Sequence, residues 1–117
     1  MTTSTQSQTV ELRGGRRATY QVIGDGEPAL VLPGGPGLAA GYMRTAAELF
    51  ADRWRCHLVD PHGSGGSSPP TDPAHYAPQG HVEFYEEVRE ALALPAVTVI
   101  GHSFGATTTL TYAALRP

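Results

Sequence analysis

Short apolar runs separated by amphipathic stretches account for most of this 117-residue chain. Residues 28–32, 54–59 and 97–100 are rich in aliphatic and β-branched side chains, and each run predicts a strand. Residues 28–32 are apolar throughout, which is typical of a strand covered on both faces. Two further predicted strands, 9–13 and 17–23, flank a glycine pair and indicate a hairpin.

Two stretches have the spacing of helices with one apolar face. In residues 41–52 that face is expected to hold Met43, Ala46, Ala47, Leu49 and Phe50. In residues 78–92 it is expected to hold Val82, Tyr85, Val88 and Leu92, with Glu83, Glu86, Glu87, Arg89 and Glu90 facing water. A third helix is predicted after residues 97–100 and ends near residue 116.

A hairpin followed by alternating strands and helices predicts an α/β fold with a largely parallel sheet and flanking helices. Three loops of unusual composition, residues 33–37, 60–70 and 101–105, each follow a predicted strand. The carboxyl ends of parallel strands share one edge of a sheet, so we expect all three loops there, where ligands bind. Residues 1–8 are expected to form a flexible leader, and residues 9–117 to belong to one domain.

Composition excludes several classes of protein. Hydrophobic residues make up 40% of the chain and charged residues 16%, as in globular domains. The net charge of −3 favours neither nucleic acid nor an anionic membrane as a partner. No apolar run approaches the roughly 18 residues of a membrane span, and the N-terminal residues do not resemble a secretory signal. A single cysteine, Cys56, fits a reducing cytoplasm and is expected to be buried packing.

Residues 101–105, Gly-His-Ser-Phe-Gly, place Ser103 at the turn between a predicted strand and a predicted helix. In such a G-x-S-x-G turn a strained backbone lifts the serine hydroxyl clear of the main chain. Gly101 and Gly105 omit Cβ atoms where strand and helix approach each other. The first N–H groups of the helix point at any anion that forms beside the serine. In a chain with 14 glycines the string could also be an ordinary turn, but its flanking elements favour a nucleophile.

Two further motifs accompany this turn: Pro-Gly-Gly-Pro-Gly at residues 33–37 and Asp-Pro-His-Gly-Ser-Gly-Gly-Ser-Ser at residues 60–68. In this order the three resemble the amino-terminal half of an α/β-hydrolase. They are most similar to the proline-iminopeptidase-like branch, in which histidine is usual at the position of Pro33. His62 also stands where the branch pattern usually differs.

The resemblance implies that Ser103 attacks an ester or amide and forms an acyl-enzyme, without a metal or other cofactor. It also implies an oxyanion hole made by the N–H of Phe104 and one N–H of the glycine pair, Gly35 in preference to Gly34. The implied substrate is a small molecule or a short peptide, with cleavage after an N-terminal proline as one case. No set of histidine, cysteine and carboxylate residues has the spacing of a metal site.

A serine mechanism needs a histidine base and a carboxylate that orients it, and in the resembled family both follow the serine. No Asp, Glu or His follows Ser103 here. Among the five histidines, His62 is the best placed as a base. His102 is expected to point away from the hydroxyl, His57 to be packing, and His75 and His81 to be solvated.

The missing base and acid lead us to expect a fragment, with a partner chain or further sequence supplying the other half. Alone, the chain is then expected to be a poor catalyst with a bare sheet edge at residues 97–100. A non-catalytic binding or assembly piece built on the same fold remains the alternative. For residues 60–70 we expect a place near the mouth of the site, with Asp60 hydrogen-bonded locally, or else a simple connection between sheet and helix.

Overall fold

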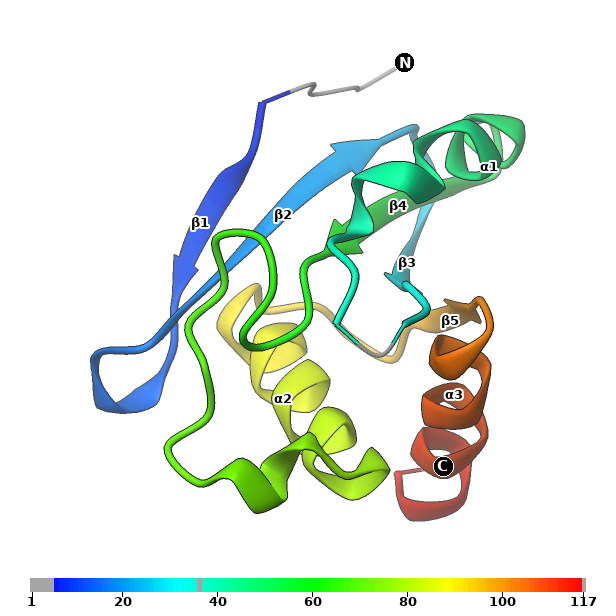
Figure 1. Cartoon of the computed structure of the whole chain (residues 1–117). Coiled ribbons are helices and arrows are strands. Elements are labelled where there is room, and N and C mark those ends of the chain that lie inside the picture. The colour runs from blue at the N-terminus through cyan, green and yellow to red at the C-terminus, as the bar shows by residue number, and fades with distance from the viewer. Residues whose placement is uncertain (1–5, 36, 117) are drawn as a thin grey trace.

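A five-stranded mixed sheet forms the centre of the computed structural model, which describes residues 6–35 and 37–116 (Figure 1). Its strands are β1 (Gln8–Glu11), β2 (Arg17–Ile23), β3 (Glu27–Leu32), β4 (Trp54–Val59) and β5 (Thr98–Gly101), in the order β1-β2-β4-β3-β5. β2 pairs antiparallel with β1 and with β4, whereas β3 is parallel to both β4 and β5. The predicted α/β fold, a hairpin followed by parallel strands, is therefore confirmed. Residues 1–5 of the expected leader lie outside the described residues, and Gln8 already begins β1.

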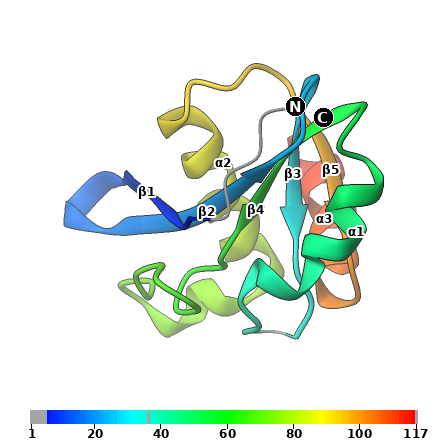
Figure 2. The same cartoon turned by 90° about the horizontal axis from the view of Figure 1, so that it is seen from above.

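Helices cover both faces of the sheet (Figures 1 and 2). The helices are α1 (Arg44–Leu49), α2 (Pro78–Ala91) and α3 (Phe104–Leu115), and the 3-10 turns are η1 (Arg13–Gly15), η2 (Ala40–Met43) and η3 (Pro73–Tyr76). α1 packs on one face, while α2 and α3 pack on the other. Within the described part of the chain, none of these helices has the length and apolar character needed to cross a membrane.

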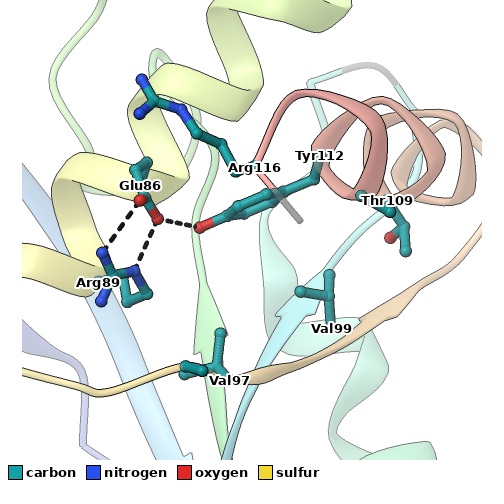
Figure 3. Close-up of a pocket in the computed structure, with 9 residues that line it drawn as sticks. Glu86, Arg89, Val97, Val99, Thr109, Tyr112 and Arg116 are labelled. Atoms are coloured by element: carbon teal, nitrogen blue, oxygen red, sulfur yellow. Dashed lines mark hydrogen bonds and ion pairs between the residues drawn. The ribbon is translucent and has the colours of Figure 1, made fainter.

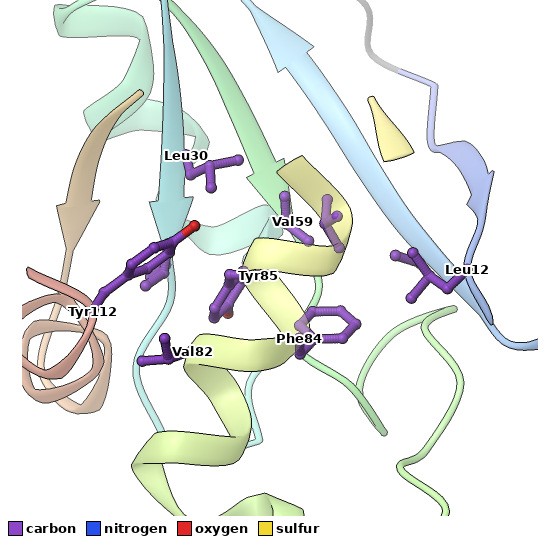
Figure 4. Close-up of a cluster of buried hydrophobic side chains, with 10 residues drawn as sticks. Leu12, Leu30, Val59, Val82, Phe84, Tyr85 and Tyr112 are labelled. Atoms are coloured by element: carbon purple, nitrogen blue, oxygen red, sulfur yellow. The ribbon is translucent and has the colours of Figure 1, made fainter. Parts of the chain in front are cut away.

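β3 lies between two apolar layers, which explains its uninterrupted apolar sequence. Leu30 and Leu32 point toward α2 and α3, and Val31 points toward α1, because successive side chains of a strand alternate between faces. Figure 4 shows the first layer, in which Tyr85 of α2 packs among side chains from the sheet and from α3. Cys56 of β4 is fully buried in the second layer, as predicted, and burial raises the pKa of its thiol.

The predicted apolar face of residues 41–52 is partly wrong. The stretch divides into η2 and α1, and the buried stripe runs through Ala40, Met43, Ala47 and Ala51. Leu49 is instead 77% exposed, and Phe50 is also on the exposed side. A 3-10 turn advances about 120° per residue rather than about 100°, so its presence rotates the stripe relative to a continuous α-helix. Small alanines on that stripe allow the segment to lie close to β4.

Glu87 on α2 is buried, although its place on the helix predicted exposure to water. Its carboxylate accepts hydrogen bonds from the backbone N–H of Arg13, at 2.7 Å, and from the guanidinium of Arg16, at 2.6 Å. Burial alone would raise the pKa of Glu87, but these two partners outweigh it and lower the pKa. The carboxylate thus ties α2 to the turn of the β1–β2 hairpin, a long-range contact that periodicity cannot show.

α2 ends in a Schellman motif that has alanine at the position usually held by glycine. Leu94 donates its N–H to the carbonyl of Arg89, and Ala93 donates to that of Glu90. Ala93 has a φ of 55°, in the left-handed region. Leu94 packs against the core cluster beneath α2, so the motif directs the chain from the helix toward β5.

Candidate functional site

The loops that follow β3, β4 and β5 lie at one edge of the sheet, as predicted, because these three strands are parallel. The N–H of His102 donates to the carbonyl of Leu32 at 3.1 Å and joins the end of β5 to the end of β3. The Ser64 hydroxyl donates to the carbonyl of Gly37 at 2.8 Å and joins the loop after β4 to the loop after β3. We call residues 101–105 the elbow and residues 33–37 the glycine loop.

Ser103 sits at the apex of the elbow in a conformation that few residues other than glycine adopt. Its φ is 56° and its ψ is −116°, and the residue is exposed. Such a backbone costs about 1–3 kcal/mol and persists only where its surroundings hold it in place. Here the start of α3 holds it, because Gly105 and Ala106 donate their N–H groups to the carbonyls of His102 and Ser103. The Ser103 hydroxyl makes no hydrogen bond to any residue that the structure describes.

The two elbow glycines lie where backbone segments are in contact. A Cβ at Gly101 would collide with the carbonyl oxygen of Gly105 and with the Thr109 side chain. A Cβ at Gly105 would collide with the carbonyl oxygen of Leu32 and lie 2.8 Å from that of Pro33. Strand and helix can therefore meet at the elbow only when both positions lack a side chain.

The predicted oxyanion donors lie close to the elbow. Phe104 is the first residue of α3, and within the described ranges neither its N–H nor that of Gly35 has an acceptor. The N–H of Gly34, in contrast, donates to the Tyr42 hydroxyl at 2.6 Å. Gly34 also packs against the elbow, since a Cβ there would lie 3.0 Å from Ser103 Cβ. Gly35 has a φ of 125°, which only glycine adopts readily.

Tyr42 is a feature of the site that the sequence did not reveal. Its hydroxyl contacts both the glycine loop, at Gly34, and the elbow, at Nδ1 of His102, 2.8 Å away. The residue belongs to η2, 8 positions after Gly34 and 60 positions before His102 in the sequence. No periodicity or motif marks it, so only the folded chain reveals this contact.

None of the five histidines hydrogen-bonds to Ser103, although all five are among the described residues. His57 is buried in β4 as predicted, and its ring Nδ1 lies 3.2 Å from the carbonyl oxygen of Ala29. His75 is exposed in η3, also as predicted. His81 is not solvated, and that prediction was wrong: it is 4% exposed, with its ring 5.2 Å from that of Phe104.

His62 and His81 form a buried pair whose ring centroids are 4.5 Å apart. His62 is 3% exposed, with the rings of Phe84 and Tyr76 at 4.9 and 5.2 Å. Nε2 of each histidine is buried and has no hydrogen-bond partner in the described part of the chain. Burial, and then the nearby charges of His81, Arg16 and His75, lower the pKa of His62 from 6.5 to about 4. This enclosure argues against His62 as an accessible base.

We expect the buried His62 to make the fold sensitive to mild acid. The unfolded chain takes up a proton near pH 6.5, whereas folded His62 does so only near pH 4. Stability from this residue is therefore complete above the unfolded pKa and is lost as the pH falls toward the folded pKa. Between about pH 7.5 and about pH 5, His62 should account for a loss of about 2 kcal/mol in the unfolding free energy that urea titrations measure. Burial also lowers the pKa of His57 and of His81, so these two histidines add to the total loss.

A His62→Phe variant supplies the matched comparison, since phenylalanine suits the aromatic surroundings and cannot ionise. Its unfolding free energy should change less over the same pH range, whereas a variant of the exposed His75, His75→Asn, should behave like the unaltered protein. Equal pH dependence in the His62→Phe variant and the unaltered protein would contradict the assignment.

Asp60, which opens the loop at residues 60–70, holds distant segments together. Its carboxylate accepts hydrogen bonds from the Thr19 hydroxyl at 2.6 Å and from the N–H of Ala40 at 2.8 Å. These side-chain partners are remote in sequence, whereas the predicted local bond is made by the backbone: the Ser67 hydroxyl donates to the carbonyl oxygen of Asp60 at 2.7 Å. Gly63 and Gly65 have φ values of 82° and 52°, as expected of glycines that permit close packing. A Cβ at Gly65 would strike the Asp60 carboxylate.

A cavity of about 630 Å³ lies apart from the elbow, between α2, α3 and the segment that enters β5 (Figure 3). Glu86 lies at its wall and accepts hydrogen bonds from Arg89, at 2.7 Å, and from the Tyr112 hydroxyl, at 2.6 Å. The bonds from Arg89 hold the pKa of Glu86 at about 2. Neither Ser103 nor the glycine loop lines this cavity, so we do not place the candidate site there. Among the described residues, no group of three or more His, Cys, Asp or Glu could hold a metal ion.

Known proteins share both the sequence and the fold of this chain. A sequence profile described as the alpha/beta hydrolase fold matches residues 28–117. A proline iminopeptidase from Heyndrickxia coagulans is 33% identical over 110 residues, which cover 92% of this chain and 38% of that protein. A 1-acylglycerol-3-phosphate O-acyltransferase from Arabidopsis thaliana is 32% identical over 96 residues, covering 80% of this chain and 23% of that protein. The chain thus spans well under half the length of these relatives.

Solved structures extend the similarity to the whole arrangement of strands and helices. A proline iminopeptidase-related protein from Thermus thermophilus superposes with a TM-score of 0.84 at 28% identity, covering 100% of this chain and 42% of that one. An epoxide hydrolase from an endophytic Streptomyces gives 0.83 at 28% identity, covering 96% and 34%. Because the profile covers most of the chain and the structures superpose over nearly all of it, the chain belongs to the alpha/beta hydrolase fold family.

Proposed function

We propose that this chain carries the nucleophile and the oxyanion-binding groups of a serine hydrolase. The observation that carries the proposal is the backbone of Ser103, which is strained and exposed. It is followed directly by the first N–H of α3, which has no acceptor among the residues that the structure describes. An ordinary serine turn has no need of that conformation. The likeness to proline iminopeptidases supports hydrolysis as the class of reaction.

In the proposed reaction, Ser103 Oγ attacks the carbonyl carbon of an ester or amide while a base removes the hydroxyl proton. The resulting oxyanion accepts hydrogen bonds from the N–H groups of Phe104 and Gly35. As the tetrahedral intermediate collapses, the bond to the leaving alcohol or amine breaks and the base returns the proton to it. Water then hydrolyses the acyl ester and restores the serine.

The base and its orienting carboxylate are the parts of this mechanism that we do not place on the described residues. His102 is bonded to Tyr42, and His62 and His81 are enclosed by aromatic rings. We propose that a histidine and a carboxylate come from further sequence of the same protein or from a partner chain. The limited share of the relatives that the chain covers is consistent with this.

For the substrate we propose a small ester or a short peptide, with an N-terminal proline residue as the first choice. The names of two groups of relatives support that choice. An epoxide hydrolase shares the fold, and a relative named as an acyltransferase shares sequence with this chain, so the first assay should include simple esters as well as proline amides.

The proposal is tested by labelling the protein from the complete gene with a fluorophosphonate, which reacts with activated serines. We expect one adduct, which peptide mass spectrometry locates on Ser103, and no adduct after heat denaturation. Absence of labelling, or an adduct on another serine, would contradict the proposal. That outcome would favour a non-catalytic binding or assembly role for the same fold.

A further inference from the structure

The Tyr42 hydroxyl lies between the two loops that carry the proposed oxyanion donors. On one side it accepts the N–H of Gly34 at 2.6 Å, and on the other it lies 2.8 Å from Nδ1 of His102. The tyrosine and imidazole rings meet edge to face, with centroids 5.7 Å apart and planes at 65°. One side chain therefore bridges the glycine loop and the elbow.

The donors and acceptors of this bridge can be satisfied together. A phenol hydroxyl has one proton and can also accept hydrogen bonds, so it can accept from Gly34 and donate to Nδ1 of His102. His102 then carries its proton on Nε2, away from the tyrosine. With this assignment both hydrogen bonds are donated in the same direction: the glycine loop donates to the tyrosine hydroxyl, and the hydroxyl donates to the side chain next to Ser103.

The bridge determines which N–H of the glycine pair stays available. The N–H of Gly34 is taken by Tyr42, whereas that of Gly35 has no acceptor among residues 6–35 and 37–116. At the same time Gly34 is held against Ser103, where a Cβ would lie 3.0 Å from Ser103 Cβ and 3.1 Å from the carbonyl oxygen of His102. Holding Gly34 in this way restrains the peptide group immediately before the one that carries the N–H of Gly35.

We propose that Tyr42 is a positioning residue, whose hydroxyl locks the glycine loop to the elbow so that the N–H of Gly35 faces the oxyanion formed at Ser103. This inference rests on the proposed function. A hydrogen-bond donor lowers a barrier only if it already lies where the charge develops, and one such donor contributes about 10²–10³-fold to the rate. Loosening the donor without removing it should forfeit part of that factor.

The Tyr42→Phe variant removes the bridging oxygen and leaves the ring in place. We expect the maximal rate of fluorophosphonate labelling at Ser103 to fall by about 10-fold or more, because the transition state loses an aligned donor. The half-saturating probe concentration should stay within about 2-fold, because the donor acts on charge that develops only during the reaction. The matched control is Tyr76→Phe: Tyr76 is 45% exposed and Tyr42 46%, but Tyr76 contacts neither loop of the bridge.

Amide hydrogen exchange gives a second measurement that does not depend on reactivity. The Gly34 amide should be protected in the unaltered protein and should exchange faster in Tyr42→Phe, with Tyr76→Phe unchanged. A Tyr42→Phe protein that labels at the unaltered rate, or that weakens only probe binding, overturns the positioning role while the assignment of Ser103 stands. If the unaltered protein does not label, both the assignment of Ser103 and the role of Tyr42 are refuted. If its Gly34 amide is not protected from exchange, the hydrogen bond from Gly34 to Tyr42 does not form and the positioning role is refuted.

Discussion

The Ser103→Ala variant of the complete protein is expected to hydrolyse its ester or amide substrate at least about 10⁴-fold more slowly than the unaltered protein. The reason is that alanine removes the oxygen that we propose forms the acyl-enzyme, while the N–H groups of Phe104 and Gly35 remain. What is left is polarisation of the carbonyl by those donors, without a covalent step. The measurement is kcat/KM for a p-nitrophenyl ester and for a proline amide.

Thr107→Ala supplies the control, because Thr107 presents an exposed hydroxyl in the first turn of the same helix. Its kcat/KM should stay within about 2-fold of the unaltered value, as is usual for a surface change away from the reacting atoms. Retention of a tenth or more of the activity by Ser103→Ala would show that Ser103 is not the nucleophile, whatever the geometry of the elbow.

The Gly105→Ala variant is expected to lose about 3 kcal/mol of unfolding free energy, as overpacking of a close contact does. The added methyl group would meet the carbonyl oxygen of Leu32, which also accepts the N–H of His102. Neither β3 nor the elbow can move aside without breaking that hydrogen bond. Helix propensity alone predicts the opposite sign, a gain of about 1 kcal/mol, so urea unfolding distinguishes the two effects.

Gly41→Ala is the matched comparison for this second prediction. Nothing lies within 4 Å of a Cβ at Gly41, and its φ is not in the left-handed region. Alanine there should leave the unfolding free energy unchanged or raise it by up to about 1 kcal/mol, because it restricts the unfolded chain. If both variants are equally stable, the close approach of β3 and α3 does not govern the elbow.

The sheet was predictable from the sequence because the apolar pattern of its strands reflects which of their faces are buried. β2 and β4 occupy the predicted ranges, and β3 and β5 are displaced by one residue at one or both ends. The parallel arrangement followed from the alternation of strands and helices. It placed the elbow, the glycine loop and the loop at residues 60–70 at one edge before any contact was known.

What the sequence could not reveal depends on contacts between distant segments. Glu87 has the spacing of a surface residue, and only the two arginines of the hairpin turn make its burial favourable. His81 follows a polar loop, yet the aromatic rings of His62 and Phe104 enclose it. Tyr42 shows no pattern because its two partners, Gly34 and His102, meet only after β3 and β5 have paired.

Among the described residues, Ala93 and Ser103 are the two residues other than glycine that have a positive φ. Replacing each of them by glycine would have opposite consequences for the protein. At the end of α2, glycine in place of Ala93 would relieve backbone strain and touch no reacting group. At the elbow, the same exchange would relieve strain and delete the hydroxyl. A search guided by stability alone would accept both changes with equal readiness. If Ser103 is the nucleophile, as we propose, position 103 is where the most stable residue and the active residue differ, and a stabilised variant must keep the serine.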